Sequence, residues 1–377
     1  MRLAILLILL GWSTLALAHK PSDSYLRLET RDSAIGIRWD IALRDLEYAL
    51  GLDGNDDGAI TWGELRARAP AIAAYALARL TLTAEGAACP SEFVDLRVDE
   101  HTDGGYAVLG LRAQCPHMPR SLEVEYRLFF DLDAQHRGLL HLAMDGAEQT
   151  AVFAPDSPRR SFELQAAPGG GNELRALRDY VREGVWHIWI GYDHILFLLS
   201  LLLPAVLARA GKRWLPAEDF RAVLCDTVRI VTAFTLAHSV TLSLAALGYV
   251  VLPSRWVESA IAASVVIAAL NNLLPLLHGR RALLAFGFGL VHGLGFASVL
   301  ADLGLPDSLR LSGLVGFNLG VELGQLAIVS GFLPLAFALR RFRLYEAAVL
   351  KAGSVGIMAV AAIWLVERGL DVRLWPA

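Results

Sequence analysis

Four apolar stretches in the carboxyl-terminal half of the chain carry side chains that can bind a metal ion. These side chains are His187, Asp193 and His194 in residues 185–207, His238 in residues 230–252, His292 in residues 282–300, and Asn318 and Glu322 in residues 313–335. A strongly polar group inside a bilayer costs free energy, so it is a candidate for function. At about 1.5 Å per residue, the histidines of three of these helices and the carboxylate of the fourth would lie roughly 12 to 15 Å deep.

Imidazole and carboxylate groups together form a ligand set for a transition metal. Ni²⁺, Co²⁺ and Zn²⁺ accept nitrogen ligands, whereas Ca²⁺ is bound by oxygens. A single histidine in a membrane helix is better explained by a hydrogen bond to a neighbouring helix, but the shared depth favours one joint site. The predicted ligands of this site are His187, Asp193, His194, His238, His292, Asn318 and Glu322. Nearer the outer face, His187 and Glu258 would form either an entrance or an interfacial pair.

Residues 53–64, Asp-Gly-Asn-Asp-Asp-Gly-Ala-Ile-Thr-Trp-Gly-Glu, follow the spacing of a calcium-binding EF-hand loop. In this spacing the calcium ligands come from Asp53, Asn55, Asp57, Ala59 through its carbonyl, Thr61 through a water, and Glu64. Apolar residues at helical spacing flank the loop, so the pattern predicts an EF-hand-like helix-loop-helix. We expect weak binding, at about 10⁻⁴ to 10⁻³ M. An Asp- and Gly-rich turn between two helices is the alternative.

The composition of the 377 residues excludes a wholly soluble protein, because 55% are hydrophobic, 19% are charged and the mean hydropathy is +0.46. The charges are divided unevenly. Residues 19–183 hold 18 Lys/Arg and 27 Asp/Glu, a net charge of −9, while residues 184–377 hold 15 and 11, a net charge of +4. Neither part is basic enough to indicate nucleic-acid binding. We therefore expect an acidic soluble domain followed by a membrane domain.

The first 18 residues have the features of a secretory signal peptide. Arg2 precedes an apolar run over residues 3–10, and the small residues of Ala16-Leu17-Ala18 form a cleavage site before His19. An uncleaved membrane anchor is the alternative. Either way, the domain that follows would lie outside the cytoplasm.

Two of the three cysteines, Cys89 and Cys115, fall in the exported part of the chain. Export leads to an oxidising compartment in which thiols pair. We therefore predict a disulfide between Cys89 and Cys115, with free thiols or metal ligation as the alternatives.

Alternating apolar and polar residues recur between residues 19 and 165 and predict an antiparallel β-sandwich. The predicted strands are 24–30, 35–43, 93–98, 107–113, 122–130, 138–144 and 150–153. The helices around the calcium-type loop would interrupt them between the second strand and the third. A glycine-rich linker and an amphipathic helix over residues 166–183 would then lead to a membrane domain of residues 184–377.

Six apolar stretches are long enough to span a bilayer, at residues 185–207, 230–252, 256–278, 282–300, 313–335 and 345–366. Alternate loops between them carry most of the positive charge. One set of loops contains Arg255 and Arg310, and the other contains Arg209, Lys212, Arg213, Arg221, Arg280, Arg281, Arg340, Arg341 and Arg343. The positive-inside rule places the loops that are rich in Lys and Arg in the cytoplasm. The sequence thus predicts a six-helix α-helical bundle in a bacterial inner membrane, with the β-domain and the carboxyl terminus in the periplasm.

The first predicted span resembles the signature His-Pro-x-x-Gly-x-Asp-His of the HupE/UreJ family. His187, Gly191, Asp193 and His194 match it, and Ile188 stands in the place of the proline. The pair His292-Gly293 resembles a His-Gly element of a later helix. The resemblance covers about residues 184–366, and the exported domain is similar to that of the larger branch of the family. Members are regarded as nickel or cobalt permeases associated with hydrogenase and urease gene clusters, so the resemblance implies transport of Ni²⁺ or Co²⁺.

Three functions agree with this pattern, and the first is a permease for a divalent transition metal, which would not be an enzyme. The second is an intramembrane zinc enzyme, in which Glu322 or Asp193 would act as general base beside three histidines. The third is an accessory protein whose β-domain docks a periplasmic partner. The sequence has no nucleotide-binding P-loop, so ATP could act only through another subunit.

Overall fold

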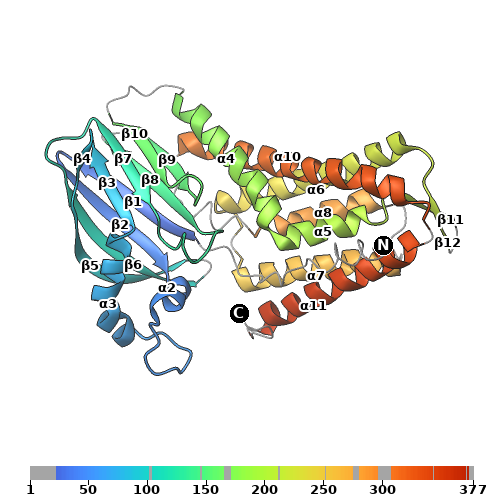
Figure 1. Cartoon of the computed structure of the whole chain (residues 1–377), viewed down its shortest axis with the longest axis horizontal. Coiled ribbons are helices and arrows are strands. Elements are labelled where there is room, and N and C mark those ends of the chain that lie inside the picture. The colour runs from blue at the N-terminus through green and yellow to red at the C-terminus, as the bar shows by residue number, and fades with distance from the viewer. Residues whose placement is uncertain are drawn as a thin grey trace, which may run out of the picture.

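The structure, a computed structural model, describes residues 23–101, 104–144, 147–164, 171–210, 213–250, 252–274, 280–295, 307–342, 344–370 and 372. The predicted signal peptide of residues 1–18, its cleavage site before His19 and the linker residues 166–170 lie outside these ranges. Figure 1 shows two parts, a β-domain coloured blue to green and a bundle of helices coloured green to red.

Two sheets form the β-domain. The larger has the order β5-β6-β2-β1-β8-β9 and the smaller the order β10-β7-β3-β4. The strands are β1 (Asp23–Arg31), β2 (Ala34–Ala42), β3 (Leu80–Ala84), β4 (Ala87–Ala88), β5 (Ser91–His101), β6 (Gly104–Gln114), β7 (Ser121–Tyr126), β8 (Arg137–Met144), β9 (Ala147–Phe153) and β10 (Arg159–Glu163). The amino-terminal region is therefore rich in β-structure, as predicted.

Side chains of both sheets fill one core. In β2, Ile35, Ile37 and Trp39 are buried because alternate residues of a strand face the same side of a sheet. They belong to the same apolar cluster as Leu82 of β3 and Val124 of β7, which lie in the smaller sheet. The two sheets therefore pack face to face as a sandwich.

The prediction that all strands pair antiparallel is wrong at one place, because β1 and β8 run parallel. A parallel pair needs a long crossover connection, and residues 32–136 supply one by passing through the helices and the smaller sheet. The sequence pattern also did not predict β3, β4 and β10. These strands have two to five residues each, too few for alternation to be recognised.

Helices α2 (Leu43–Leu50) and α3 (Trp62–Leu77) lie between β2 and β3. Leu46 of α2 and Leu65 of α3 are buried in the core of the sandwich. Ile60, within the acidic loop, packs against the same core. The sandwich therefore anchors both helices and presents residues 53–64 at its surface (Figure 1).

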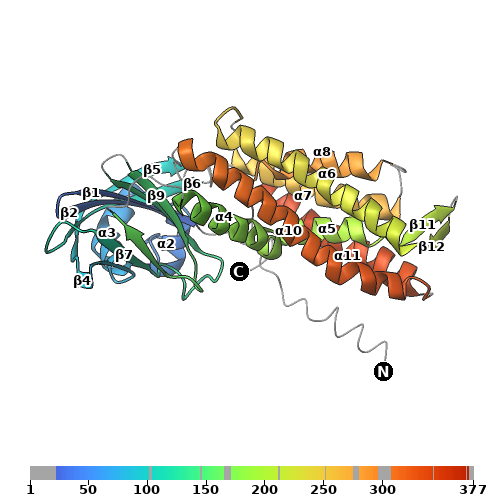
Figure 2. The same cartoon turned by 90° about the horizontal axis from the view of Figure 1, so that it is seen from above.

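The helical part consists of α4 (Gly171–Ile190), α5 (Tyr192–Leu202), α6 (Phe220–Ala246), α7 (Ser254–Leu273), α8 (Arg281–His292), α10 (Asp307–Leu339), the π-helix η1 (Tyr345–Ala352) and α11 (Gly353–Leu370). A hairpin of β11 (Leu207–Ala210) and β12 (Arg213–Pro216), which the sequence did not predict, connects α5 to α6. Figures 1 and 2 place the β-domain at one end of the bundle and this hairpin at the other.

Four helices are long and apolar enough to cross a membrane: Phe220–Ala246, Ser254–Leu273, Leu311–Leu339 and Tyr345–Leu370. A fifth crossing exists if Leu177–Ile190 and Tyr192–Leu202, bent by 71°, form one broken span. Within the predicted span 282–300 the described helix is α8, which is shorter, and residues 296–300 lie outside the described ranges. The protein is thus a multi-pass membrane protein, with four or five of the six predicted spans meeting this test.

Helix α10 shows how the bundle separates lipid-facing from packed surfaces. Leu311, Val315, Leu319 and Leu323, spaced four apart, are exposed, as expected for a face that meets lipid. Gly316, Gly320 and Gly324 form a second row, which contacts Leu177, Val181 and Val185 of α4. A Cβ atom on Gly320 would overlap the carbonyl oxygen of Val181. Small residues therefore set the close packing of α4 on α10.

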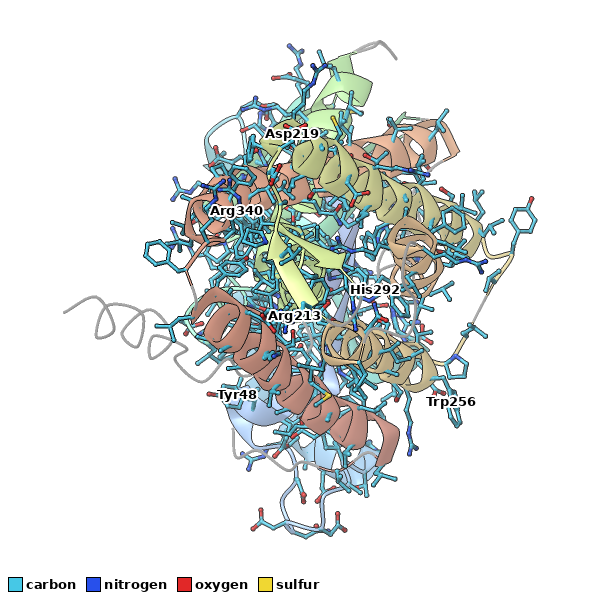
Figure 3. All side chains as sticks on the ribbon, turned by 90° about the vertical axis from the view of Figure 1, so that its right-hand side faces the viewer. Tyr48, Arg213, Asp219, Trp256, His292 and Arg340 are labelled. Carbon is cyan, nitrogen blue, oxygen red and sulfur yellow. A yellow bond between two sulfur atoms is a disulfide. The ribbon has the colours of Figure 1, made fainter. Side chains whose placement is uncertain are left out.

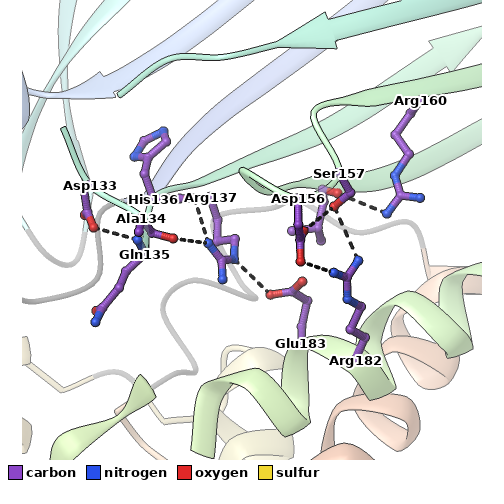
Figure 4. Close-up of polar contacts among 11 residues, drawn as sticks. Asp133, Ala134, Gln135, His136, Arg137, Asp156, Ser157, Arg160, Arg182 and Glu183 are labelled. Atoms are coloured by element: carbon purple, nitrogen blue, oxygen red, sulfur yellow. Dashed lines mark hydrogen bonds and ion pairs between the residues drawn. The ribbon is translucent and has the colours of Figure 1, made fainter. Parts of the chain in front are cut away.

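Ion pairs join the β-domain to α4 (Figure 4). Figure 4 shows Arg137 of β8, which lies 3.4 Å from Glu183, and Arg182, which binds Asp156. In addition, Arg160 of β10 lies 3.7 Å from Asp179. Below these pairs, apolar side chains of the large sheet share a buried cluster with side chains of α4, α6 and α10. Helix α4 thus runs from the β-domain into the bundle without interruption and fixes one against the other.

Cys89 and Cys115 form a disulfide in the β-domain, and Cys225 on α6 is a free, exposed thiol. A disulfide that closes a loop of this length stabilises the folded state by about 3 to 4 kcal/mol. We expect the double substitution C89S/C115S to lower the free energy of unfolding of the β-domain by this amount. Urea unfolding of the full-length protein, followed by pulse proteolysis, measures the loss. C225S is the matched control and should have no effect, and equal urea midpoints for all variants would contradict the prediction.

Candidate metal centre

A bend at Gly191 brings His187 and His194 together. Seven residues of a straight helix rise about 10.5 Å, yet the two imidazole rings lie 4.6 Å apart between centroids. The bend is 71° and Gly191 separates α4 from α5. A Cβ atom at Gly191 would lie 2.6 Å from the carbonyl oxygen of His187, so the bend requires glycine.

Helix α6 adds a third imidazole to this pair. Ring nitrogens of His187, His194 and His238 all lie within 4.8 Å of one another. His194 and His238 are buried, and His238 has no exposed surface. These three side chains, on three different helices, form the group that we call the three-histidine cluster.

His292, at the end of α8, lies against this cluster. Its ring centroid is 5.1 Å from that of His194, and Figure 3, which looks along the bundle from the hairpin end, shows it among the helices. Gly293 permits this position, since a Cβ atom there would overlap the carbonyl oxygen of His238 and the hydroxyl of Thr241. Helices α6 and α8 therefore meet at backbone contact next to their histidines.

Asp193 orients His194. One carboxylate oxygen, Oδ1, accepts from the backbone N–H of His194 at 2.9 Å and from its ring Nδ1 at 3.0 Å. A carboxylate can only accept, so Nδ1 carries the proton and Nε2 presents a lone pair. Among the described residues this Nε2 is buried and has no hydrogen-bond partner. Through Oδ1, Asp193 thus orients the ring that would bind a metal.

Asn318 orients His238 in the same way. The amide nitrogen of Asn318 donates to the carbonyl of Leu314 at 2.8 Å, so its oxygen faces His238 Nδ1 at 3.4 Å as an acceptor. The ring proton therefore sits on Nδ1. His238 Nε2 has no partner within the described part of the chain.

Ser264 of α7 orients His292. The hydroxyl of Ser264 has one proton, which it donates to the carbonyl of Ile261 at 2.6 Å. It therefore accepts from His292 Nε2 at 2.8 Å, and Nδ1 of His292 carries the lone pair. That nitrogen is also buried and without a partner in the described ranges. Ser264 is a residue of this site that the sequence did not predict, although a hydroxyl in the middle of an apolar helix was a signal for it.

Within the part of the chain that the structure describes, the arrangement leaves neutral imidazole lone pairs of His194, His238 and His292 buried without hydrogen bonds. A buried acceptor without a partner costs free energy, unless a cation takes its lone pair. Aromatic walls enclose the site, since Phe234 and Phe197 lie 5.3 and 5.0 Å from the His292 ring. Neutral nitrogen donors in apolar surroundings suit Ni²⁺, Co²⁺ or Zn²⁺ and do not suit Ca²⁺ or Mg²⁺.

Glu322 is not part of the three-histidine cluster. Its Oε1 accepts from Thr232 of α6 at 2.8 Å, and its Oε2 is buried without a partner among the described residues. Thr232 precedes His238 by six residues, or about 9 Å along α6, on the side toward the hairpin. Glu322 therefore bonds to α6 at Thr232 rather than at His238.

The calcium-type loop has a backbone that agrees with its sequence. Asp56 and Gly58 take left-handed φ angles of 57° and 82°, and the N–H of Gly58 donates to Asp53 Oδ2 at 2.8 Å. The hydrogen bond from Gly58 holds the pKa of Asp53 below its ordinary value, and those from Thr61 do the same for Glu64. Both carboxylates are therefore ionised at neutral pH and point into one loop at the surface.

A second group in the β-domain, Asp40, Asp99 and His101, has metal-like spacing. Arg38 already donates to both carboxylates, at 2.8 Å to Asp40 and 2.5 Å to Asp99. Burial alone would raise the pKa of Asp40, but hydrogen bonds from His101 and Arg38 hold it below its ordinary value. The group is thus an ion-pair network that joins β2 to β5 across β6.

A β-rich domain fixed to apolar helices, with histidines buried between the helices, defines a multi-pass membrane protein with a candidate transition-metal centre. Residues 164–368 match the family model described as HupE / UreJ protein. The match covers more than half of the 377 residues, so the chain belongs to the HupE/UreJ family. Curated protein sequences gave no match to the chain. The family connects this protein with nickel and cobalt transport.

The close contact of α8 with α6 at Gly293 can be tested by substitution. We expect G293A to destabilise the protein by about 1 to 3 kcal/mol, because the added methyl group overpacks the contact of α8 with α6. Thermal unfolding in detergent measures this. G287A is the matched control, since a Cβ atom at Gly287 meets nothing within 4 Å, and it should change stability by no more than about 0.5 kcal/mol. Equal melting temperatures for the two variants would contradict the assigned packing.

Proposed function

We propose that the protein is a permease of the bacterial inner membrane that carries a divalent transition metal, Ni²⁺ or Co²⁺, through the three-histidine cluster. The observation that supports this most is the set of buried lone pairs on His194, His238 and His292, which have no partner among the described residues. Each belongs to a ring whose other nitrogen is held by Asp193, Asn318 or Ser264. A second hydrogen bond of this kind fixes the tautomer and the direction of a metal-binding imidazole.

His187 is the member of the cluster that lies before the bend, and His292 provides a fourth imidazole beside it. Because the bend interrupts the helix at Gly191, the ring of His187 reaches the ligand nitrogens of two other helices. Borderline metals exchange among several imidazoles more readily than among thiolates, which bind them tightly. A site whose direct ligands are histidines therefore suits an ion that must bind and then leave. Asp193, Asn318 and Glu322 would assist from positions around the histidines.

The distribution of charge supports an orientation with the β-domain and the carboxyl terminus in the periplasm. Arginines gather at the hairpin end, where Arg340 donates to the carbonyl of Ala217 and Arg281 to that of Leu201. The β-domain lies at the opposite end (Figure 1). Excess arginine marks the cytoplasmic face of bacterial membrane proteins. In this orientation the β-domain is available to a periplasmic protein partner.

We propose further that residues 53–64 bind Ca²⁺ as an EF-hand-like loop. Asp53, Asn55 and Asp57 lie in the loop between α2 and α3, and Glu64 lies in the first turn of α3. The backbone takes left-handed conformations at the fourth and sixth of the twelve positions. Hard oxygen ligands in this spacing are those that Ca²⁺ prefers, with Ala59 and Thr61 completing the set. The role would be structural, because both helices are anchored in the core of the sandwich.

Metal binding by the three-histidine cluster is tested by titrating the purified protein with Ni²⁺ or Co²⁺ in a calorimeter, and by uptake of the labelled metal into vesicles. We expect H194A and H238A to lower the affinity by at least about 100-fold, since the loss of an orienting partner alone costs 10- to 100-fold, and to abolish uptake. H117A is the matched control, because His117 is exposed in the β-domain. Equal uptake by wild type, H194A and H238A would overturn the proposed site. One tightly held Zn²⁺ without uptake would favour the metalloenzyme instead.

Calcium binding is tested with Tb³⁺, whose luminescence Trp62 would sensitise from the tenth position of the loop. We expect D53A to remove the signal, because Asp53 is the first ligand and also holds the loop through Gly58. D56N is the control, since Asp56 occupies a position that supplies no ligand. Added Ca²⁺ should displace Tb³⁺ in the millimolar range. An unchanged signal in D53A would contradict the proposal.

A further inference from the structure

Arg368 lies between two carboxylates at the end of the bundle that carries the β-domain. Its Nη1 is 3.8 Å from Asp193 Oδ2, and its Nε is 3.8 Å from Glu258 Oε2. It also donates to the carbonyl of Glu258 at 3.4 Å. The three side chains come from α11, α5 and α7, and each keeps 20 to 25% of its surface exposed.

Asp193 connects this group to the three-histidine cluster. Its Oδ1 accepts from His194, and its Oδ2 faces Arg368. A continuous row of polar side chains therefore runs from Glu258 through Arg368 and Asp193 to the ring of His194. Two carboxylates and one guanidinium, which stays charged at every relevant pH, give the outer part of this row a net charge of −1.

The row lies on the periplasmic side of the cluster in the proposed orientation. Glu258 is in the second turn of α7, which begins at Ser254, and Arg368 is in the last turn of α11. Ser264, which orients His292, lies six residues beyond Glu258, or about 9 Å deeper along α7. A cation that comes from the β-domain end along this row meets Glu258 and Arg368 before it meets a histidine.

The contacts of Arg368 are looser than those of a structural ion pair. A guanidinium that clamps a carboxylate does so through two hydrogen bonds of about 2.7 to 2.9 Å, whereas both ion-pair distances here are 3.8 Å. Glu258 has its own partner in Ser254, at 2.6 Å. The guanidinium can therefore leave the carboxylates without leaving Glu258 unpaired.

We propose that Arg368 is a tethered counter-cation that a divalent metal displaces on its way to the three-histidine cluster. The incoming ion takes Glu258 and then Asp193 as oxygen ligands while the guanidinium swings aside, so the outer group changes from a net charge of −1 with Arg368 to zero with the ion in its place. When Arg368 returns, its positive charge opposes escape of the metal by the same route. The inference rests on the proposed function, whose cargo it requires.

The direction in which R368Q changes the affinity for Ni²⁺ distinguishes this role from a structural one. We expect R368Q to raise the affinity for Ni²⁺ at least about tenfold in calorimetry, because a unit positive charge next to the site repels a divalent ion. If Arg368 only positioned Asp193, R368Q would lower the affinity. R255Q is the matched control, since Arg255 binds the carbonyl of the neighbouring Gly369 without facing Asp193, and it should leave the affinity unchanged. R368K, which keeps the charge, should stay within about threefold of wild type.

A second measurement keeps the test valid if R368Q does not fold. E258Q should slow the association of Ni²⁺ at least about tenfold in stopped-flow mixing, because the first carboxylate on the route has lost its charge. Two outcomes would overturn the role of Arg368: an unchanged association rate in E258Q, or an unchanged or lower affinity in R368Q. Either outcome counts against Arg368 alone when wild type still binds metal and H194A does not. Absence of Ni²⁺ and Co²⁺ binding in wild type would instead overturn the proposed function.

Discussion

The bend at Gly191 is the constraint on which the membrane part of this protein depends. A straight helix would keep His187 and His194 two turns apart, and the bend reduces their separation to 4.6 Å. Helix α4 packs along α10, whereas α5, after the bend, packs against α7. The same glycine therefore assembles the histidines and directs the following helix to the two helices that carry Glu258 and Arg368.

Fixing the imidazole rings is the second requirement, and it is met by hydrogen bonds from outside the cluster. Asp193, Asn318 and Ser264 come from three helices, and each holds the nitrogen that faces away from the centre. Asn318 and Ser264 act as acceptors here, because the amide oxygen of Asn318 faces the ring and the single hydroxyl proton of Ser264 goes to a backbone carbonyl. The lone pairs that remain are thus a consequence of the packing of α7 and α10, and not of the histidines alone.

The β-domain is joined to this centre through α4. Arg137, Arg160 and Arg182 bind Glu183, Asp179 and Asp156 across the junction, and a buried apolar cluster lies beneath them. A domain held at several points transmits displacement, whereas a domain on a flexible linker does not. A displacement of the β-domain would therefore act on α4, and with it on the position of His187.

Four features could be predicted from the sequence: the polar residues of the apolar half, the longer strands, the disulfide between Cys89 and Cys115, and the family signature at His187, Gly191, Asp193 and His194. These are local properties, and periodicity and spacing encode them directly. The parallel pairing of β1 with β8, the bond of Glu322 to Thr232, and the contacts of Ser264 and Arg368 depend on tertiary packing and are not encoded locally. Depth along a helix gives one coordinate of a side chain, but contact also depends on the rotation of each helix and on how closely glycines such as Gly293 and Gly320 let the helices approach.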